Sequence, residues 1–197
     1  EIESFYDGVH GFGGHGNVIA PRIEPNDSFI ARMTPPRAGT FIYHTHFDEA
    51  RQQSGGLYGA FVVLERGRKW DPAHDRIIML GTSRDTTNDL LIDGQFAPTM
   101  HFKAGASYRI RLINITLARP SVLVSLTDGK KLLEWNVVAQ DGADLPSYQA
   151  GMRPASIQIT IGQTFDMLFK APPAGEYALE VRTGVGALVG KARLLVE

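Results

Sequence analysis

The segment "GTFIYHTHFDEARQQSGGLYGAFVVLE" (residues 39–65) holds two runs of β-forming residues, which are separated by a polar stretch and bounded by glycines. β-Branched and aromatic residues favour strands, so the segment predicts two strands joined by a short helical turn over 47–53. In a strand, alternate side chains point to the same face. His44 and His46 therefore share a face about 6.5–7 Å apart, a spacing that suits a bound metal ion.

The same pattern continues along the rest of the chain. Alternating apolar and polar residues mark further short runs at 28–33, 107–114, 132–139, 156–160, 164–169 and 176–181. Asp-Gly pairs at 93–94, 128–129 and 141–142 are typical of tight turns between strands. Long helical periodicity is absent from the sequence. The sequence therefore predicts an all-β fold of the sandwich class.

Composition limits the classes of function. The 197 residues are 43% hydrophobic with 21 Gly and 11 Pro, enough apolar sequence for one large or two small β domains. A net charge of −1 gives no reason to expect nucleic acid or a membrane surface as a partner. No run approaches the ~20 apolar residues of a membrane-spanning helix. Because there is no Cys, disulfides, thiolate metal sites and cysteine nucleophiles are excluded. The chain begins with Glu1 and not with Met, and we expect a processed or truncated product.

An internal repeat relates the two ends of the chain. Residues 23–46 align without gaps on residues 159–182, and both copies place a Pro-x-Ala-Gly turn before a strand. Where the first copy has the two histidines, the second has a Glu and an Arg. We therefore predict two related β units, 1–66 and 67–197, divided near the charged stretch 65–75. Only the first unit keeps a face that can bind a metal.

The histidine pair has more than one interpretation. Two histidines on a strand can simply be hydrogen-bonded parts of the sheet surface. The same spacing occurs in mononuclear zinc sites, but zinc needs a third protein ligand that the sequence does not indicate. Imidazole also binds copper, so the residue type alone does not choose the metal.

The wider sequence resembles a known family. "AGTFIYHTH" (38–46) followed by "GGLYGAFVVLE" (55–65) resembles the copper-binding strand of multicopper oxidases, the laccase-like enzymes. The segments "GASYRIRLIN" (105–114), "VVAQDGADL" (137–145) and "ITIGQTFDMLF" (159–169) are similar to the copper-free middle domain of three-domain members. The resemblance covers essentially the whole chain and implies cupredoxin-like Greek-key β-sandwiches, one incomplete and one complete.

The resemblance also implies domain identities and site residues. Residues 1–66 would be the C-terminal part of cupredoxin domain 1, and 67–197 would be domain 2 without copper ligands. His44 and His46 would each bind a different copper of a type 3 pair through one ring nitrogen, with the other nitrogen held by neighbouring groups. Asp7 matches the family's acidic residue near the trinuclear copper cluster, which helps to deliver protons. An Asp before Gly is equally typical of a turn.

The activity that the resemblance implies is copper-dependent oxidation of a small reducing substrate, coupled to four-electron reduction of dioxygen to water. The type 1 copper needs a Cys, which this chain lacks. We therefore expect a third cupredoxin domain beyond Glu197, an N-terminal half-domain before Glu1, and no activity of this fragment alone. The family implies a periplasmic or extracellular location, and a homo-oligomer is possible. The alternative is a non-catalytic β-sandwich binding or assembly module with a vestigial or mononuclear histidine site.

The remaining polar residues are given no part in the copper site. Four histidines are interpreted as loop or surface residues: His10, His15, His74 and His101. Arg109 and Arg111 alternate with apolar residues, which predicts the solvated face of a strand. Asn26 and Asn114 begin matches to the glycosylation sequon, a short pattern that is frequent by chance.

Overall fold

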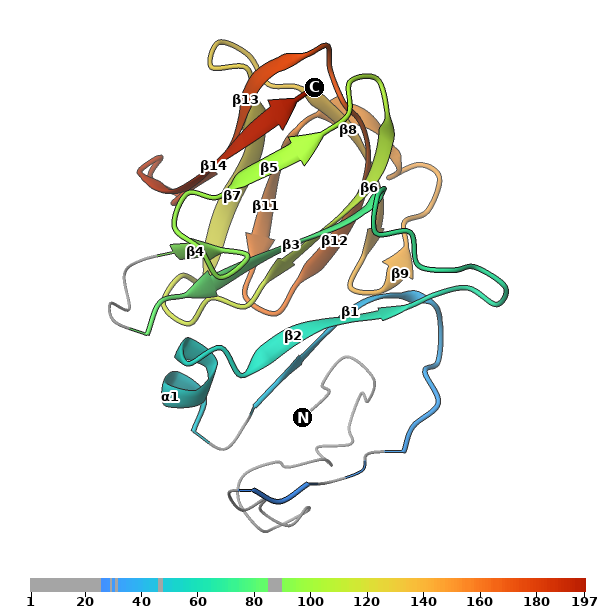
Figure 1. Ribbon diagram of the computed structural model, residues 1–197, viewed down its shortest axis with the longest axis vertical. Helices are drawn as coiled ribbons and strands as arrows, with labels where there is room; N and C mark the ends of the chain where they lie inside the picture. The colour runs from blue at the N-terminus through green and yellow to red at the C-terminus, as the bar shows by residue number, and fades with distance from the viewer. Residues whose placement is uncertain (1–25, 29, 31, 46–47, 85–89) are drawn as a thin grey trace.

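The first secondary-structure elements of the described chain form a β-hairpin with a short helix in its connection (Figure 1). The computed structural model describes residues 26–28, 30, 32–45, 48–84 and 90–197. Strand β1 (Gly39–His44) pairs antiparallel with β2 (Tyr58–Val63), and α1 (Glu49–Ser54) lies between them in the sequence. The two strands and the helical turn expected here are confirmed, each boundary lying within about two residues of the prediction.

The remaining strands form two larger sheets, which face each other as a sandwich (Figure 1). Their bounds are β3 (Asp75–Thr82), β4 (Leu90–Ile92), β5 (Thr99–Phe102), β6 (Ser107–Asn114), β7 (Ser121–Thr127), β8 (Glu134–Gln140), β9 (Ala143–Asp144), β10 (Gly151–Pro154), β11 (Ser156–Thr160), β12 (Thr164–Lys170), β13 (Gly175–Arg182) and β14 (Leu188–Val196). The seven-stranded sheet has the order β10-β8-β12-β6-β3-β4, with β9 beside β8. The five-stranded sheet has the order β11-β7-β13-β14-β5. The all-β sandwich predicted from the alternation is confirmed.

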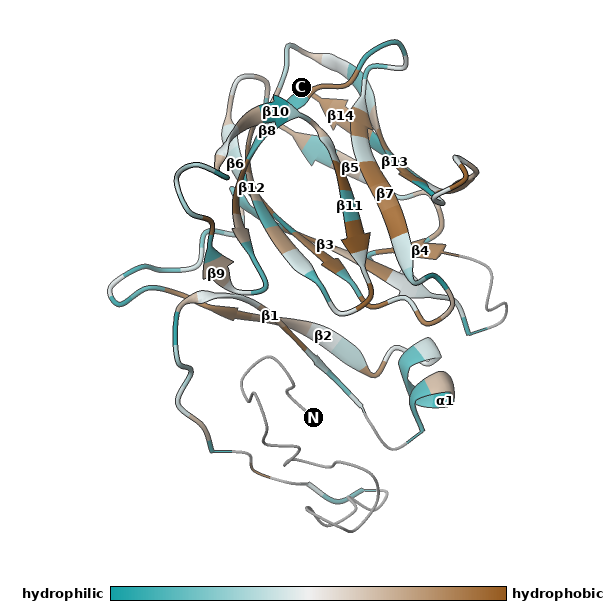
Figure 2. Cartoon of the chain, turned by 180° about the vertical axis from the view of Figure 1, so that it is seen from behind, coloured by the Kyte–Doolittle hydropathy of each residue, from teal (hydrophilic) through white to brown (hydrophobic). Residues whose placement is uncertain are grey.

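The apolar core lies between these two sheets. In β8, Trp135 and Val137 alternate with more exposed residues and point into the core. Met167 of β12 and Leu179 of β13 meet them there and are also buried. Figure 2 shows the hydrophobic residues concentrated in strands such as β7 and β11. Full burial of each large apolar side chain contributes about 1.5–3 kcal/mol, so this core supplies most of the stabilisation of the sandwich.

The tight turns fall at the predicted Asp-Gly pairs. Asp93 and Gly94 have φ values of 51° and 75°, and Asp141 and Gly142 have 48° and 69°. Two successive residues with positive φ are typical of the turns that join antiparallel strands. At the third pair only the glycine, Gly129, has a positive φ, of 88°.

One predicted strand is not found among the residues that the structure describes. Residues 28, 30, 32 and 33 lie outside any strand, so the prediction of a strand over 28–33 is wrong at these positions. Its counterpart in the repeat lies in β12, which is hydrogen-bonded to β6 on one side and to β8 on the other. A strand needs partners for its backbone groups, and no described strand flanks residues 28–33. Alternation alone therefore does not determine where a strand forms.

The β1–β2 hairpin packs against the seven-stranded sheet. Thr164 of β12 donates from Oγ1 to the carbonyl oxygen of Thr40 over 3.0 Å. Arg37 donates from Nε to the carbonyl oxygen of Gly142 over 2.7 Å. Ile42 closes the contact by packing into a small apolar cluster that includes residues of β3 and β6. The hairpin is thereby held on the sheet by both hydrogen bonds and apolar contacts.

Gly142→Ala is expected to lower the free energy of unfolding by about 2–4 kcal/mol. Gly142 has a φ of +69°, and a Cβ there would lie 2.2 Å from Cε1 of the fully buried Phe41 ring. Gly129→Ala is the matched control, because φ is +88° but nothing lies within 4 Å of an added Cβ. Urea unfolding followed by circular dichroism measures both variants. Equal losses would contradict the contact between Phe41 and the turn.

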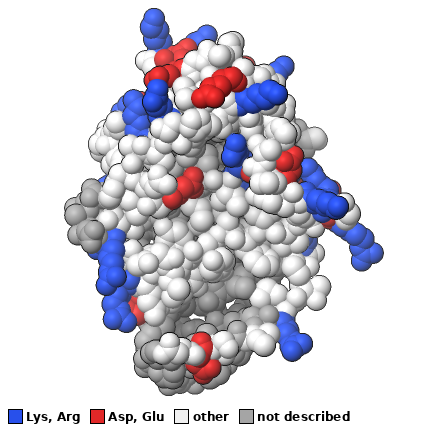
Figure 3. Space-filling model, viewed as in Figure 1, with Lys and Arg blue, Asp and Glu red and all other residues white. Residues whose placement is uncertain are grey.

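Charged side chains of both signs are interspersed on the face shown in Figure 3, in keeping with the net charge of −1. The helix α1 has six residues, and no helix in the described part of the chain is long and apolar enough to cross a membrane.

Candidate metal centre

His44 is the last residue of β1 and lies opposite Tyr58 across the hairpin. Its ring is half-buried. Nδ1 lies 2.8 Å from the carbonyl oxygen of Thr45 and 2.9 Å from Nε2 of Gln53. These two contacts orient the ring through Nδ1, so a metal ion bound by this ring would be bound by Nε2.

Gln53 reaches His44 because α1 folds the chain back after β1. The helix carries Glu49 in its first turn, where a negative charge interacts favourably with the helix dipole. Near its end, the Gln53 side chain is 5% exposed and faces the histidine. The neighbouring Gln52 accepts a hydrogen bond at Oε1 from the hydroxyl of Thr45. The side-chain amides of Gln52 and Gln53 are therefore both held against the end of β1.

The contacts at Nδ1 allow two tautomers of His44. With the proton on Nδ1, the ring donates to the carbonyl oxygen of Thr45, which also accepts from Gln53 Nε2 at 3.4 Å. With the proton on Nε2, Nδ1 instead accepts from Gln53 Nε2. Hydrogen-bond partners of this kind decide which ring nitrogen carries the proton. Only the first tautomer presents an Nε2 lone pair to a metal ion.

The donor chemistry at His44 fits copper, because imidazole nitrogen is a good copper ligand. The described residues contain no group of three His, Cys, Asp or Glu side chains that could hold a metal ion. His46 and Asp7, the other predicted members of the site, lie outside the described residues, as do His10 and His15. The pairing of His44 with His46 and the place of Asp7 therefore stay predictions.

Tyr58 packs β2 against the sandwich next to His44. A Cβ added to Gly81 would lie 2.1 Å from Tyr58 Oη, so the hydroxyl occupies the space that the glycine leaves. Burial raises the pKa of Tyr58, and the nearby Asp93 carboxylate raises it further. Burial also raises the pKa of Asp93, whose Oδ1 accepts a hydrogen bond from the Met79 N–H over 2.7 Å. The tyrosine opposite the candidate ligand is therefore neutral at physiological pH.

Two histidines of the sandwich are surface residues, as predicted. His74 Nδ1 lies 2.8 Å from Asp71 Oδ2, and His101 Nδ1 lies 3.5 Å from Glu197 Oε1. The hydrogen bond from His74 lowers the pKa of the Asp71 carboxyl. More than half of each histidine side chain is exposed. Both contacts are ordinary surface pairs.

Arg109 and Arg111 do not form the solvated strand face that the sequence predicted. Arg111 is 4% exposed and binds Asp75 Oδ1 at 2.8 Å and Asp166 Oδ2 at 2.9 Å. Arg109 binds the same oxygen of Asp166 at 2.6 Å. The prediction is wrong because the hairpin covers this part of β6, with Thr40 Oγ1 2.8 Å from Arg111 Nη1. Alternation cannot distinguish a solvated face from one that a distant segment covers.

The two sequon matches differ in exposure. Asn114 is fully buried, and its Oδ1 accepts from both the N–H and the hydroxyl of Thr116. This match is therefore a structural turn and not a glycosylation site. Asn26 lies in an exposed turn with a φ of 67°.

The fold is that of the cupredoxin-like β-sandwiches. Two family models, both described as multicopper oxidase, match residues 43–193 and residues 3–68. The first of these matches covers more than half of the chain. The chain therefore belongs to the multicopper oxidase family, a family of copper oxidoreductases.

Individual relatives agree with this assignment. The iron transport multicopper oxidase FET5 of Saccharomyces cerevisiae is 24% identical over 191 residues, which cover 84% of this chain and 29% of that protein. L-ascorbate oxidase of Nicotiana tabacum is 36% identical over 52 residues, which cover 26% of this chain and 9% of that enzyme. The chain thus spans less than a third of the length of these relatives.

Solved structures show the same fold. A bacterial laccase-like multicopper oxidase, CueO from Ochrobactrum sp., matches with a TM-score of 0.77 and 19% identity, over 100% of this chain and 48% of that one. A multicopper oxidase from Pseudomonas thermotolerans matches with a TM-score of 0.69 and 22% identity, over 93% of this chain and 47% of that one.

Proposed function

We propose that this chain is part of a laccase-like oxidase, which couples one-electron oxidation of a small substrate to four-electron reduction of dioxygen to water. The observation that supports the proposal is the His44 ring, held through Nδ1 at the end of β1 so that Nε2 is the metal-binding nitrogen. In this proposal, residues 1–66 belong to a first cupredoxin domain. Residues 67–197 form a second domain without copper ligands.

The residues of this chain have distinct roles in the proposed site. Bound copper supplies the one-electron steps that dioxygen reduction requires. His44 and His46 would each hold one copper of a type 3 pair. Gln53 and Thr45 orient the His44 ring and decide which of its nitrogens carries the proton. Asp7 acts as the acidic residue that passes protons toward the reduced oxygen.

Further parts of the proposed oxidase lie outside this sequence. A type 1 copper site needs a Cys, and this chain has none. The reducing substrate therefore binds near a third cupredoxin domain, and an N-terminal half-domain completes the first one. The protein acts in the periplasm or outside the cell, as the family implies.

The stoichiometry of dioxygen consumption tests the proposal. The full-length protein that contains this sequence is loaded with Cu(II), and a phenol that donates single electrons is added. We expect one dioxygen to be consumed for every four electrons donated, without release of hydrogen peroxide, because O₂ + 4 H⁺ + 4 e⁻ gives 2 H₂O. A chelator should stop the reaction and added copper should restore it.

Two results would count against this function. A copper-loaded protein that consumes no dioxygen would favour the alternative, a non-catalytic β-sandwich module with a vestigial or mononuclear histidine site. Hydrogen peroxide as the main product would exclude the four-electron reaction. An oxygen electrode and a peroxide assay distinguish these outcomes.

A further inference from the structure

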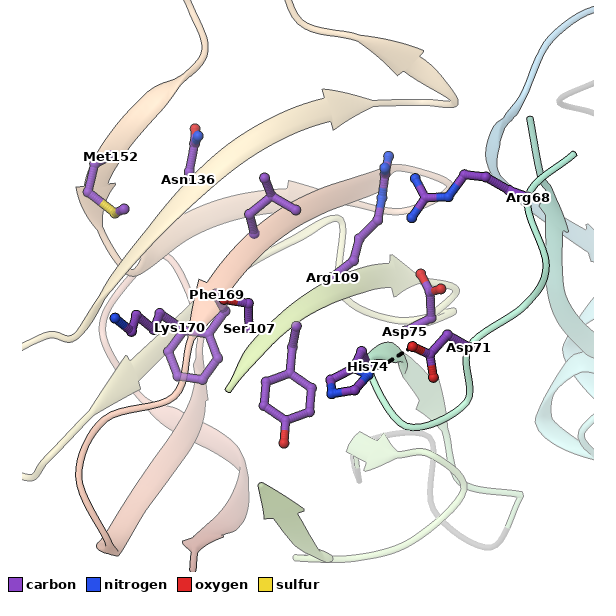
Figure 4. Close-up of a pocket in the computed structure, with 12 residues that line it drawn as sticks. Arg68, Asp71, His74, Asp75, Ser107, Arg109, Asn136, Met152, Phe169 and Lys170 are labelled. Carbon is purple, nitrogen blue, oxygen red and sulfur yellow. Dashed lines mark hydrogen bonds and ion pairs between the residues drawn. The ribbon is translucent and has the colours of Figure 1, made fainter. Parts of the chain in front are cut away.

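The outer face of the seven-stranded sheet carries a cavity that His44 does not line (Figure 4). Its volume of about 430 Å³ lies in the range of small-molecule sites. The strand register sets its floor, because Met152, Asn136, Leu168 and Arg109 lie in one row across β10, β8, β12 and β6. The cavity therefore has a polar end at Arg109, and its other end carries the apolar Met152 and Leu168 beside the exposed Lys170.

Three guanidinium groups lie at or beside the polar end of the cavity. Arg109 and Arg111 form ion pairs with Asp75 and Asp166, and these two cations and two anions compensate each other. Arg68 adds a third guanidinium group, and Figure 4 shows it extending toward Arg109. Two guanidinium groups that approach each other repel unless an anion lies between them. This end of the cavity is therefore suited to an anionic group.

The neighbouring acids do not satisfy Arg68. Glu65 and Asp144 line an adjoining narrow cleft together with Arg68, but neither forms an ion pair with it. Asp71, which also lines the cavity, is paired with His74. The Arg68 side chain forms no hydrogen bond or ion pair with any other residue that the structure describes. Arg68 is exposed, so its guanidinium group is accessible to a ligand from solution.

The other end of the cavity offers apolar surface. Leu168 of β12 and Met152 of the edge strand β10 are 46% and 66% exposed on the floor. Between them, Asn136 uses Oδ1 to accept from the Gly151 N–H over 2.9 Å, which leaves its Nδ2 group available as a donor. The floor therefore suits an apolar body with a polar atom near its middle.

We propose that this cavity binds a small organic carboxylate, whose anionic group lies between Arg68 and Arg109 and whose apolar part covers Leu168 and Met152. A guanidinium group binds a carboxylate through two parallel N–H donors. Arg109 uses Nε and Nη2 for Asp166, which leaves its Nη1 donors for the ligand. The site needs no copper, so it goes beyond the oxidase function and does not depend on it.

Benzoate is the probe, and benzamide is its neutral control of the same shape. Both are titrated by calorimetry into the full-length protein from which copper has been removed. We expect saturable binding of benzoate, and binding at least about tenfold weaker for benzamide, because a charge-assisted hydrogen-bond pair is lost. Arg68→Gln should weaken benzoate by a similar factor. Arg68→Lys, which keeps the charge but loses the planar fork, should give a smaller loss.

Lys69→Gln is the matched control variant, since Lys69 is exposed, carries the same charge and does not line the cavity. It should leave the affinity for benzoate unchanged within about twofold. Leu168→Ser tests the apolar surface of the cavity. It should weaken the binding of benzoate severalfold without changing the salt dependence of that binding. Circular dichroism confirms that each variant is folded, as expected for exposed positions.

Three results would overturn the site. Equal losses of benzoate affinity for Arg68→Gln and Lys69→Gln would mean that general surface charge, and not the cavity, determines binding. Benzamide binding as tightly as benzoate would leave only an apolar cleft. No saturable binding even at tens of millimolar benzoate would remove the site altogether.

Discussion

Replacing His44 by alanine is expected to lower the dioxygen turnover of the copper-loaded full-length protein by about 100-fold or more. Loss of a residue that only supports a metal ligand costs about 10–100-fold, so loss of a ligand itself should reach at least the upper end of this range. Copper content and the near-ultraviolet absorption of the proposed copper pair should fall together with turnover. Elemental analysis, spectroscopy and an oxygen electrode measure the three quantities.

His101→Ala is the matched control for this prediction. His101 is an exposed histidine of the sandwich whose contact with Glu197 is 3.5 Å long, so its loss should change neither copper content nor turnover. Gln53→Ala should give an intermediate result, because His44 keeps its donor atom but loses a group that orients the ring. If His44→Ala kept the turnover and absorption of His101→Ala, the assignment of His44 as a ligand would be wrong.

The fold could be predicted from the sequence where side chains alternate and partner strands are present. The bounds of β6 and β11, 107–114 and 156–160, agree with the prediction at both ends, and the helical turn over 47–53 is α1. The same alternation over 28–33 gave a wrong prediction at the described positions 28, 30, 32 and 33, which have no described strand beside them. Alternation reports local preference, whereas strand pairing depends on segments far away in the sequence.

For the candidate site, the sequence indicated the proposed ligand but not the residues that orient its ring. The spacing of His44 and His46 indicated a metal, but nothing in the sequence distinguished Gln53 from Gln52 as the amide that meets the ring. The burial of Arg111 was missed for a related reason. Its partners Asp75 and Asp166 lie 36 and 55 residues away, and the hairpin that covers it comes from another part of the chain. An acidic residue on another predicted strand, such as Asp166 in 164–169, would have been a signal that Arg111 has a buried partner.

Arg111→Met is expected to lower the free energy of unfolding by about 3–5 kcal/mol, the second large effect. Methionine has a similar length but donates no hydrogen bonds, so the nearly buried Asp75 loses both donors that Arg111 provides. The hydroxyl of Thr40 loses its donor as well. Asp166 keeps Arg109 and should lose less. Chemical unfolding of wild type and variant gives the difference.

The matched control is Arg193→Met, because the ion pair of Arg193 with Glu176 has both side chains at least half exposed. Solvent screens such a pair, and its loss should cost no more than about 1 kcal/mol. The double variant Arg111→Met with Asp75→Leu should recover part of the loss, since it leaves no uncompensated buried carboxylate at that position. Equal destabilisation by the two Arg→Met changes would mean that solvent reaches Arg111. The hairpin carrying His44 would then not cover β6, and the packing that positions the candidate ligand would have to be revised.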